Sequence, residues 1–268
     1  ATVWSPPVWM KYCENYGCPD PTWNRLSNGV GPVPGTPGGK ANMYPEYAEY
    51  SAAFIKKFKQ EAGFDLYAFS FANEPAFAQA FPSAVYSSEQ YRDALSVISD
   101  RMQAEGVRNT VKLFGPEDVQ VFERIQSYVD TWADNTAIRK KMDIMAIHGY
   151  GNDGATAGDS DQNWIKTWDL AKKYNYKVWM TETSGYPNTW DGAMSLANSI
   201  HSALKFGKIS AWVFWTFNSG DGDSAPYGIM VNRSKTKRFY TSKNYYKYIR
   251  PGAVMVDANS ADNDIKVT

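Results

Sequence analysis

Two glutamates, Glu74 and Glu182, are the residues whose type and position point most directly to chemistry. Each ends an apolar run that we interpret as a buried strand, Tyr67–Ala72 before Asn73-Glu74-Pro75 and Val178–Thr181 before Glu182. A buried carboxylate is costly unless it is paired or used in function. For either residue alone, a structural ion pair is the alternative. Two carboxylates at strand ends are together typical of enzymes that hydrolyse glycosidic bonds.

Further polar side chains follow other predicted strands. Asn73 can exchange hydrogen bonds with a sugar hydroxyl. His148 and Tyr150 stand two positions apart at the end of an apolar run, so they can face the same side. A hydrogen bond from either ring to a nearby carboxylate would favour its ionised form. For His148 the alternative is a histidine packed in the core or exposed on the surface.

Aromatic residues make up 15% of the chain, with 10 Trp and 18 Tyr. We expect part of this set to fill the core and the rest to line a cleft, where flat rings suit the C–H faces of sugars. Trp4 and Trp215 are our candidates for sugar contacts. For Trp215 the alternative is packing inside the fold.

The charge pattern limits the partners. Lys plus Arg and Asp plus Glu number 28 each, for a net charge of +0, which argues against nucleic acid or an anionic membrane as partner. No apolar run of about 18 residues predicts a membrane span. With 2 His and no second Cys pair, a zinc site is not expected. No glycine-rich phosphate loop follows the first predicted strand, so no cofactor is expected.

Cys13 and Cys18 are the only cysteines. We expect a disulfide between them that closes a small loop if the protein is secreted, and two free thiols otherwise. The chain begins inside an apolar run at Ala1, with no visible signal peptide, as a processed or truncated product would. We expect a secreted, extracellular protein.

Short apolar segments alternate with segments of helical periodicity. The predicted strands are Thr2–Trp9, Leu66–Ala72, Val111–Gly115, Ile144–His148, Lys177–Thr181 and Ala211–Thr216. Helices are predicted from Pro45, after Ser87 with a capping box to Gln90, and at Val119–Ala133, Gln162–Tyr174, Gly192–Phe206 and Thr241–Ile249.

This alternation predicts an α/β fold with parallel strands covered by helices. Polar residues at the carboxyl ends of several strands favour a closed (β/α)8 barrel over an open doubly wound sheet. Only about six of the eight strand–helix units are visible, so the barrel is incomplete. Pro75 biases the backbone of Glu74 towards an extended conformation.

Several motifs together resemble glycoside hydrolase clan A. They are Asn73-Glu74-Pro75, His148-Gly149-Tyr150, Trp179-Met180-Thr181-Glu182 and Trp212–Trp215. Within the clan, the segments Trp4–Lys11 and Tyr248–Gly252 resemble family 30, with family 5 as the close relative. The resemblance covers nearly the whole chain.

The resemblance implies roles for these residues. Glu74, on the family's fourth strand, would be the acid/base and Glu182, on the seventh, the nucleophile of a retaining mechanism. That mechanism requires carboxyl groups about 5–5.5 Å apart. Asn73 would hold the sugar 2-hydroxyl. The family's first two strands would be missing from this chain.

The resemblance also sets the expected domains. Residues 1–250 would form the truncated barrel and residues 251–268 the remnant of a β-sandwich side domain or a tail, with Ala253–Ala258 as a linking strand. Asn28–Lys40 would be a loop on the active-site side or a passive connection. Open strand edges invite pairing, so we expect a homo-oligomer or a rearranged N-terminus that fills the gap.

The substrate is suggested by one departure from the family. Glucuronoxylan-specific members carry Arg after the eighth strand, whereas Asn218–Ser224 is acidic and lacks Arg. We therefore expect cleavage of internal linkages in undecorated β-1,4-glucan of the cellulose type. An endo-β-1,4-xylanase is the alternative, and a non-catalytic carbohydrate-binding truncated barrel is the alternative of another class.

Overall fold

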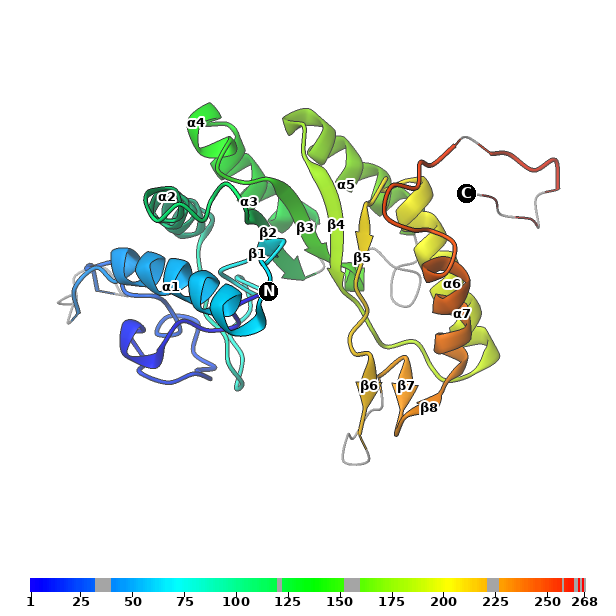
Figure 1. Ribbon diagram of the computed structural model, residues 1–268, viewed down its shortest axis with the longest axis horizontal. Coiled ribbons are helices and arrows are strands. Elements are labelled where there is room, and N and C mark those ends of the chain that lie inside the picture. Colours follow the sequence, from blue (N-terminus) through cyan, green and yellow to red (C-terminus); the bar gives the residue numbers. More distant parts are fainter. Residues whose placement is uncertain are drawn as a thin grey trace. The chain divides into compact units, whose positions relative to one another are not determined.

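The structure is a computed structural model that describes residues 1–31, 40–119, 122–151, 160–220, 227–256 and 258–262, with Ile265 and Val267 (Figure 1). The chain forms two compact units. The first comprises Ala1–Val119 and Glu123–Ala146, and the second Gln120–Phe122 and Ile147–Thr268. Among the described residues, no helix combines the length and the apolar character needed to cross a bilayer.

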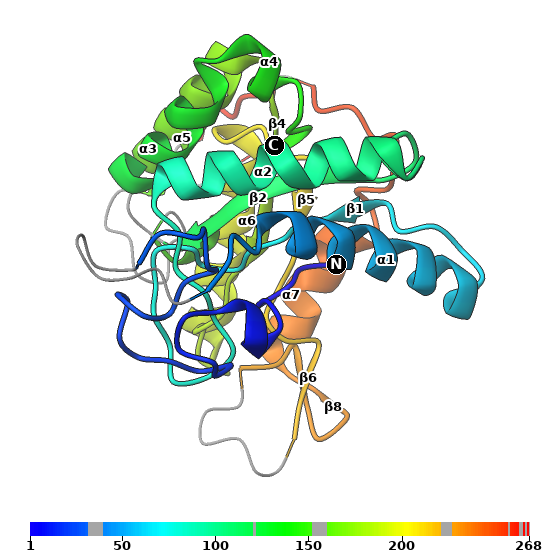
Figure 2. The same cartoon turned by 90° about the vertical axis from the view of Figure 1, so that its left-hand side faces the viewer.

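The first unit holds two long helices and short parallel strands. Its elements are η1 (Val8–Met10), α1 (Tyr44–Ala62), β1 (Ala68–Phe69), α2 (Ser88–Ala104), β2 (Lys112–Val119), most of α3 (Phe122–Ala133), α4 (Thr136–Arg139) and the start of β3 (Ile144–His148). Strands β1 and β2 are parallel, with Ala68 opposite Lys112. Helices α1 and α2 lie side by side (Figure 2).

Local signals explain where these helices begin and end. Pro45 lies in the first turn of α1, and Gly63, with a φ of 77°, ends that helix. The predicted capping box of α2 is present, since Ser87 and Gln90 exchange side-chain and backbone hydrogen bonds. Residues at the ends of the two helices therefore determine where α1 ends and where α2 begins.

Aromatic packing attaches the helices to the strand that leads to Glu74. The Phe69 ring lies 6.0 Å from that of Phe54 on α1, and the Phe71 ring lies 4.5 Å from that of Tyr91 on α2. Phe69, Phe71 and Tyr91 are all buried. The segment Ala68–Phe71 is thus fixed from its helical side.

The second unit continues the alternation. It contains the end of β3, η2 (Gly149–Gly151), α5 (Ser160–Tyr174), β4 (Lys177–Glu182), α6 (Trp190–Lys205), β5 (Ala211–Trp212) and α7 (Lys237–Tyr246). A small sheet follows β5, made of β6 (Asn218–Ser219), β7 (Met230–Val231) and β8 (Ser234–Lys235). Strands β4 and β5 are parallel, with Trp179 opposite Ala211.

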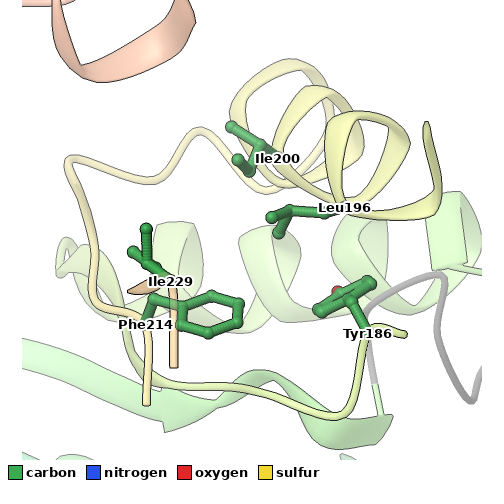
Figure 3. Close-up of a cluster of buried hydrophobic side chains, with 5 residues drawn as sticks. All are labelled: Tyr186, Leu196, Ile200, Phe214 and Ile229. Atoms are coloured by element: carbon green, nitrogen blue, oxygen red, sulfur yellow. The ribbon is translucent and has the colours of Figure 1, made fainter. Parts of the chain in front are cut away.

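A hydrophobic cluster holds α6 against the segments around β5. It consists of Tyr186, Leu196, Ile200, Phe214 and Ile229 (Figure 3). Leu196 and Ile200 project from α6 towards Phe214, which follows β5, and each of the five is at most 8% exposed. The backbone next to Trp215 is therefore anchored in a packed core.

The strand order supports the expected fold class. Neighbouring strands follow chain order, β1-β2-β3 in the first unit and β3-β4-β5 in the second, because β3 crosses the boundary between the units. A doubly wound sheet would reverse its order at a switch point. The chain has a mixed α/β fold of an incomplete (β/α)8 type, with five such strands rather than the predicted six.

Two predicted strands are wrong. In Thr2–Trp9 only Thr2 forms a bridge, to Ser70, and Val8–Met10 is a 3-10 helix. Pro6 and Pro7 have no N–H to donate and cannot continue a ladder.

The predicted linking strand Ala253–Ala258 is likewise not formed in its described part, which excludes Asp257. Val254 is 84% exposed and Val256 is 69% exposed. A strand needs a neighbour for its backbone hydrogen bonds, and these exposed residues have no strand beside them among the described residues.

Candidate active site

Glu74 lies just beyond β1 and is buried, with 9% of its surface exposed. The side-chain amide of Gln79 donates a hydrogen bond of 2.8 Å to Glu74 Oε2. Gln79 is itself 8% exposed, and Asn73 is 7% exposed. The carboxylate is thus held by a neutral donor inside the first unit, with Asn73 as its buried neighbour in the chain.

The backbone of Glu74 corrects one expectation. Its φ is 45°, in the left-handed region rather than the extended conformation that Pro75 favours. The Glu74 amide donates to the Glu117 carbonyl oxygen at 3.1 Å, which ties the end of β1 to the end of β2. This bond offsets part of the cost of a conformation that L-residues seldom adopt.

Glu117 is a second unusual glutamate beside this position. Its φ is 58° and it is 3% exposed. Its carboxylate accepts a hydrogen bond from the Thr2 hydroxyl at 3.0 Å. The next residue, Asp118, is fully buried and paired with Arg124, and burial raises the pKa of the Asp118 carboxyl despite that pairing.

Glu182 ends β4 in the second unit, in different surroundings. The hydroxyl of Tyr150 donates to Glu182 Oε1 at 2.9 Å, and His148 Nδ1 lies 3.9 Å from the same oxygen. The Tyr150 hydroxyl also lies 3.4 Å from Ser184 Oγ. The hydrogen bond expected from Tyr150 to a carboxylate is therefore present, and such a donor favours the ionised form.

Gly149 allows His148 and Tyr150 to reach Glu182. A Cβ at this position would lie 3.1 Å from Met180 Cγ and 3.2 Å from Thr183 Cβ, both closer than ordinary contact. Glycine thus lets η2 pass close to β4. His148 is 1% exposed, and its ring lies 6.1 Å from that of Tyr150.

The two predicted aromatic residues, Trp215 and Trp4, belong to different units. Trp215 is 39% exposed, and its amide donates to the carbonyl of Thr183, the residue after Glu182, at 2.9 Å. The structure thus ties Trp215 to the end of β4. Trp4, in the first unit, is half-buried and lies 5.8 Å from the ring of Phe81.

Sequence reasoning missed Gln79, Glu117 and Ser184. Gln79 and Ser184 lie in irregular segments, where no period indicates which way a side chain points. Glu117 lies inside β2, a strand that runs to Val119 and so beyond the predicted end at Gly115. A polar residue shortly after a predicted strand is the signal that would have found it.

The predicted disulfide is not formed, and Cys13 and Cys18 are free thiols. Their Sγ atoms instead face backbone carbonyls, Cys13 that of Asn15 at 3.6 Å and Cys18 that of Asp20 at 3.8 Å. Burial and the neighbouring Cys13 raise the pKa of the Cys18 thiol to about 11. The Cys18 thiol also interacts with that of Cys13.

Two predicted loops lie partly outside the described residues. In Asn28–Lys40 this concerns positions 32–39, and in Asn218–Ser224 it concerns positions 221–224. The described start of the second segment is strand β6, which pairs with β7.

The two glutamates are thus held in unlike ways. Glu74 is buried and bound by a neutral amide, whereas Glu182 is half-buried and accepts from a tyrosine hydroxyl beside an imidazole. Carboxyl groups in different environments are suited to different tasks, one as a proton donor and the other as an ionised group.

Known proteins resemble the chain in sequence and fold, although no protein-family model matches it. The chain is 26% identical to glucuronoxylanase XynC of Bacillus subtilis over 231 residues, which are 84% of the chain and 49% of XynC.

Solved structures share its fold. The family 30 subfamily 8 xylanase Xyn30A of Clostridium acetobutylicum superposes with a TM-score of 0.69 at 24% identity, covering 93% of this chain and 55% of that one. A family 30 endoxylanase of Clostridium papyrosolvens superposes with a TM-score of 0.71 at 23% identity. The match covers 97% of this chain and 57% of that one. The chain thus has the fold of family 30 structures and spans about half the length of the relatives it matches.

Proposed function

We propose that this chain is a retaining glycoside hydrolase that cleaves internal linkages of plant cell-wall polysaccharide. The observation that carries the proposal is Glu182 at the end of β4, held by the Tyr150 hydroxyl at 2.9 Å. Similarity to a glucuronoxylanase along 84% of the chain supports it.

The reaction would proceed in two steps. In the first, Glu182 attacks the anomeric carbon while Glu74 donates its proton to the leaving oxygen, so the glycosidic bond breaks and a glycosyl ester forms. In the second, Glu74 takes a proton from water, which attacks the same carbon and releases Glu182. Both steps require carboxyl groups about 5–5.5 Å apart.

The neighbouring residues have distinct tasks in this scheme. The Tyr150 hydroxyl favours the ionised nucleophile, as a donor to a carboxylate does. Gln79 orients Glu74 through its 2.8 Å hydrogen bond. Asn73 would bind the sugar 2-hydroxyl, and Trp4 and Trp215 would stack on sugar rings.

We place a xylan backbone first and β-1,4-glucan second. The relatives support this order, because they are a glucuronoxylanase and two family 30 xylanases. The expectation of glucan rested on an acidic segment whose two aspartates, Asp221 and Asp223, lie outside the described part of the chain. A polymeric substrate of this kind lies outside cells, so we propose extracellular action.

Hydrolysis of xylan and of carboxymethylcellulose, followed by reducing-sugar release, tests the proposal. We expect activity on xylan, loss of about 10²–10⁴-fold in Glu74→Gln, and background activity in Glu182→Gln. Glu46→Gln is the matched control, since Glu46 is exposed on α1. Activity on carboxymethylcellulose but not on xylan would reverse our order of substrates.

Two further measurements separate the roles and the alternatives. Proton NMR of the first product should show retention of the anomeric configuration. With added azide, Glu182→Ala should form the inverted glycosyl azide and Glu74→Ala the retained one. Parent and Glu182→Gln proteins that bind xylan equally but never cleave it would instead identify a non-catalytic sugar-binding protein.

A further inference from the structure

A groove of about 450 Å³ is lined by residues of α6 and α7. The two helices pack against each other in the second unit (Figure 1). Residues of α6 form one wall, among them Trp190 and Met194, and residues of α7 form the other, among them Lys237, Tyr240 and Asn244. None of the residues proposed for catalysis lines it.

Two hydrogen bonds join the walls of the groove. The Thr241 hydroxyl donates to the Ala193 carbonyl at 3.0 Å, and the Tyr245 hydroxyl donates to the Ala197 carbonyl at 2.9 Å. Both bonds cross from α7 to α6 along the floor. A preformed site loses little entropy when it binds.

Its rim presents aromatic rings to solvent. Trp190 is 68% exposed, Tyr240 is 54% exposed and Met194, also in the lining, is 45% exposed. Asn244 adds an amide that can donate and accept. Flat rings beside an amide suit a sugar chain, which offers apolar C–H faces and hydroxyl groups together.

Charge distinguishes this surface from the rest of the chain. Residues 231–250 contain no Asp or Glu, and their exposed cations are Arg233, Lys235, Lys237, Lys243, Lys247 and Arg250. Within the described part of the chain these six form no ion pair. The whole chain has a net charge of +0, so this segment is an uneven concentration of positive charge.

We propose that this α6–α7 groove is a second polysaccharide-binding site that takes a uronate-bearing stretch of a xylan-type chain. Trp190 and Tyr240 would stack on the backbone sugars, and Lys237, the charged residue in the lining, would pair with a uronate carboxylate. The choice of polysaccharide rests on the proposed function. The site would hold the polymer while other parts of it are cleaved.

Binding is tested on the Glu182→Gln background, so that the polymer stays intact. Affinity electrophoresis compares glucuronoxylan with xylan stripped of its uronate branches. We expect Lys237→Met to weaken binding to glucuronoxylan by about fivefold and to leave binding to stripped xylan unchanged. Trp190→Ala should weaken both by about threefold to tenfold.

Lys166→Met is the matched control, because it removes one exposed lysine from α5 of the same unit and should change neither affinity. Added salt should weaken binding of the parent to glucuronoxylan more than it weakens binding of Lys237→Met, which keeps only the other cations of the segment. Equal affinity of parent, Lys237→Met and Trp190→Ala for glucuronoxylan would overturn the proposal. So would equally tight binding of a nucleic acid, or self-association that Trp190→Ala abolishes.

Hydrolysis of a short xylo-oligosaccharide by proteins with Glu182 intact separates this inference from the proposed function. The groove variants should cleave the oligosaccharide at the parent rate. Cleavage without any groove-dependent binding to polymer overturns only the second site. Groove-dependent binding without cleavage overturns only the proposed hydrolase.

Discussion

The Tyr150 hydroxyl donates a hydrogen bond directly to the proposed nucleophile, Glu182. Tyr150→Phe removes the 2.9 Å hydrogen bond to Glu182 together with the 3.4 Å contact to Ser184 Oγ. A hydrogen bond to a charged group contributes about 1.5–3 kcal/mol, so we expect kcat/KM to fall by about tenfold to a hundredfold. This donor favours the ionised carboxylate of Glu182. Its loss should therefore shift the acidic limb of the pH–rate profile of Tyr150→Phe to higher pH.

A full pH–rate profile of Tyr150→Phe measures both effects. Tyr176→Phe, a tyrosine beyond α5 with 6% exposure, is the control for a general loss of a hydroxyl. An unchanged profile and rate in Tyr150→Phe would show that the contact has no part in catalysis.

Cys18 gives a prediction about pH. Burial raises the pKa of its thiol to about 11 from an ordinary value of 9.0, so the folded protein holds this proton more tightly than the unfolded chain. The associated stability is complete below pH 9 and is lost as the pH rises towards 11. Alkylation of Cys18 should therefore be slow at pH 8 and accelerate up to about pH 11.

Iodoacetamide labelling read by peptide mass spectrometry gives the rate at each pH. In parallel, Cys18→Ser should lose less stability between pH 9 and pH 11 than the parent in urea titrations. Rapid labelling of Cys18 at pH 7 in the folded protein would contradict the raised pKa.

Among the elements, α6 has the clearest energetic role, because its buried face holds the segment before Trp215. Leu196 is fully buried and packs in the cluster with Phe214. Leu196→Ala should lower the free energy of unfolding by about 2–5 kcal/mol through lost burial and a cavity. Met194→Ala, on the exposed side of the same helix, should lower the free energy of unfolding far less.

Chemical denaturation of both variants provides the comparison. If Leu196→Ala also lowers kcat/KM at a temperature where it stays folded, the cluster positions Trp215. If Leu196→Ala and Met194→Ala lower the free energy of unfolding by the same amount, the cluster does not anchor α6.

Elements with local signals were predictable, and those decided by distant partners were not. Ile144–His148 has the predicted bounds because its four consecutive apolar residues, Ile144–Ile147, have few other places to lie than a buried strand. The capping box at Ser87 depends on a neighbour three residues away. Thr2–Trp9 failed because its apolar character says nothing about a partner strand, and its prolines remove donors.

The residues of the candidate site also fall into those that local sequence signals predict and those that depend on distant partners. Glu74, Glu182, His148 and Tyr150 could be predicted as candidate site residues because they follow recognisable strands. Gln79 was missed because its contact with Glu74 depends on how the irregular segment after Pro75 folds back. The left-handed backbone of Glu74 was missed because it depends on a hydrogen bond to Glu117, 43 residues away.

For the whole molecule, the free strand edges determine whether copies associate. At one edge, Ser70 beside β1 exchanges backbone hydrogen bonds with Ala1 and Val3, so the N-terminus covers it in the first unit. In the second unit, β5 ends at Trp212, and Val213 after it is 50% exposed. An open edge pairs with other chains.

Sedimentation velocity over a range of concentrations tests this idea. We expect association in the parent and less of it in Val213→Lys, because charge on an edge opposes pairing. Val254→Lys, at an 84% exposed residue outside any strand, should associate like the parent. A parent that stays monomeric at all concentrations would exclude the expected homo-oligomer.

The φ of 45° at Glu74 sets the stability of the backbone against the need for a carboxylate at this position. Replacing alanine by glycine usually lowers the stability of the folded protein. At a position with a left-handed backbone, glycine should instead be the more stable of the two. Glu74→Gly and Glu74→Ala lose the same carboxylate, and only glycine relieves the backbone, so Glu74→Gly should be more stable by about 1 kcal/mol. The proposed reaction therefore needs a carboxylate at a backbone position whose conformation suits glycine best.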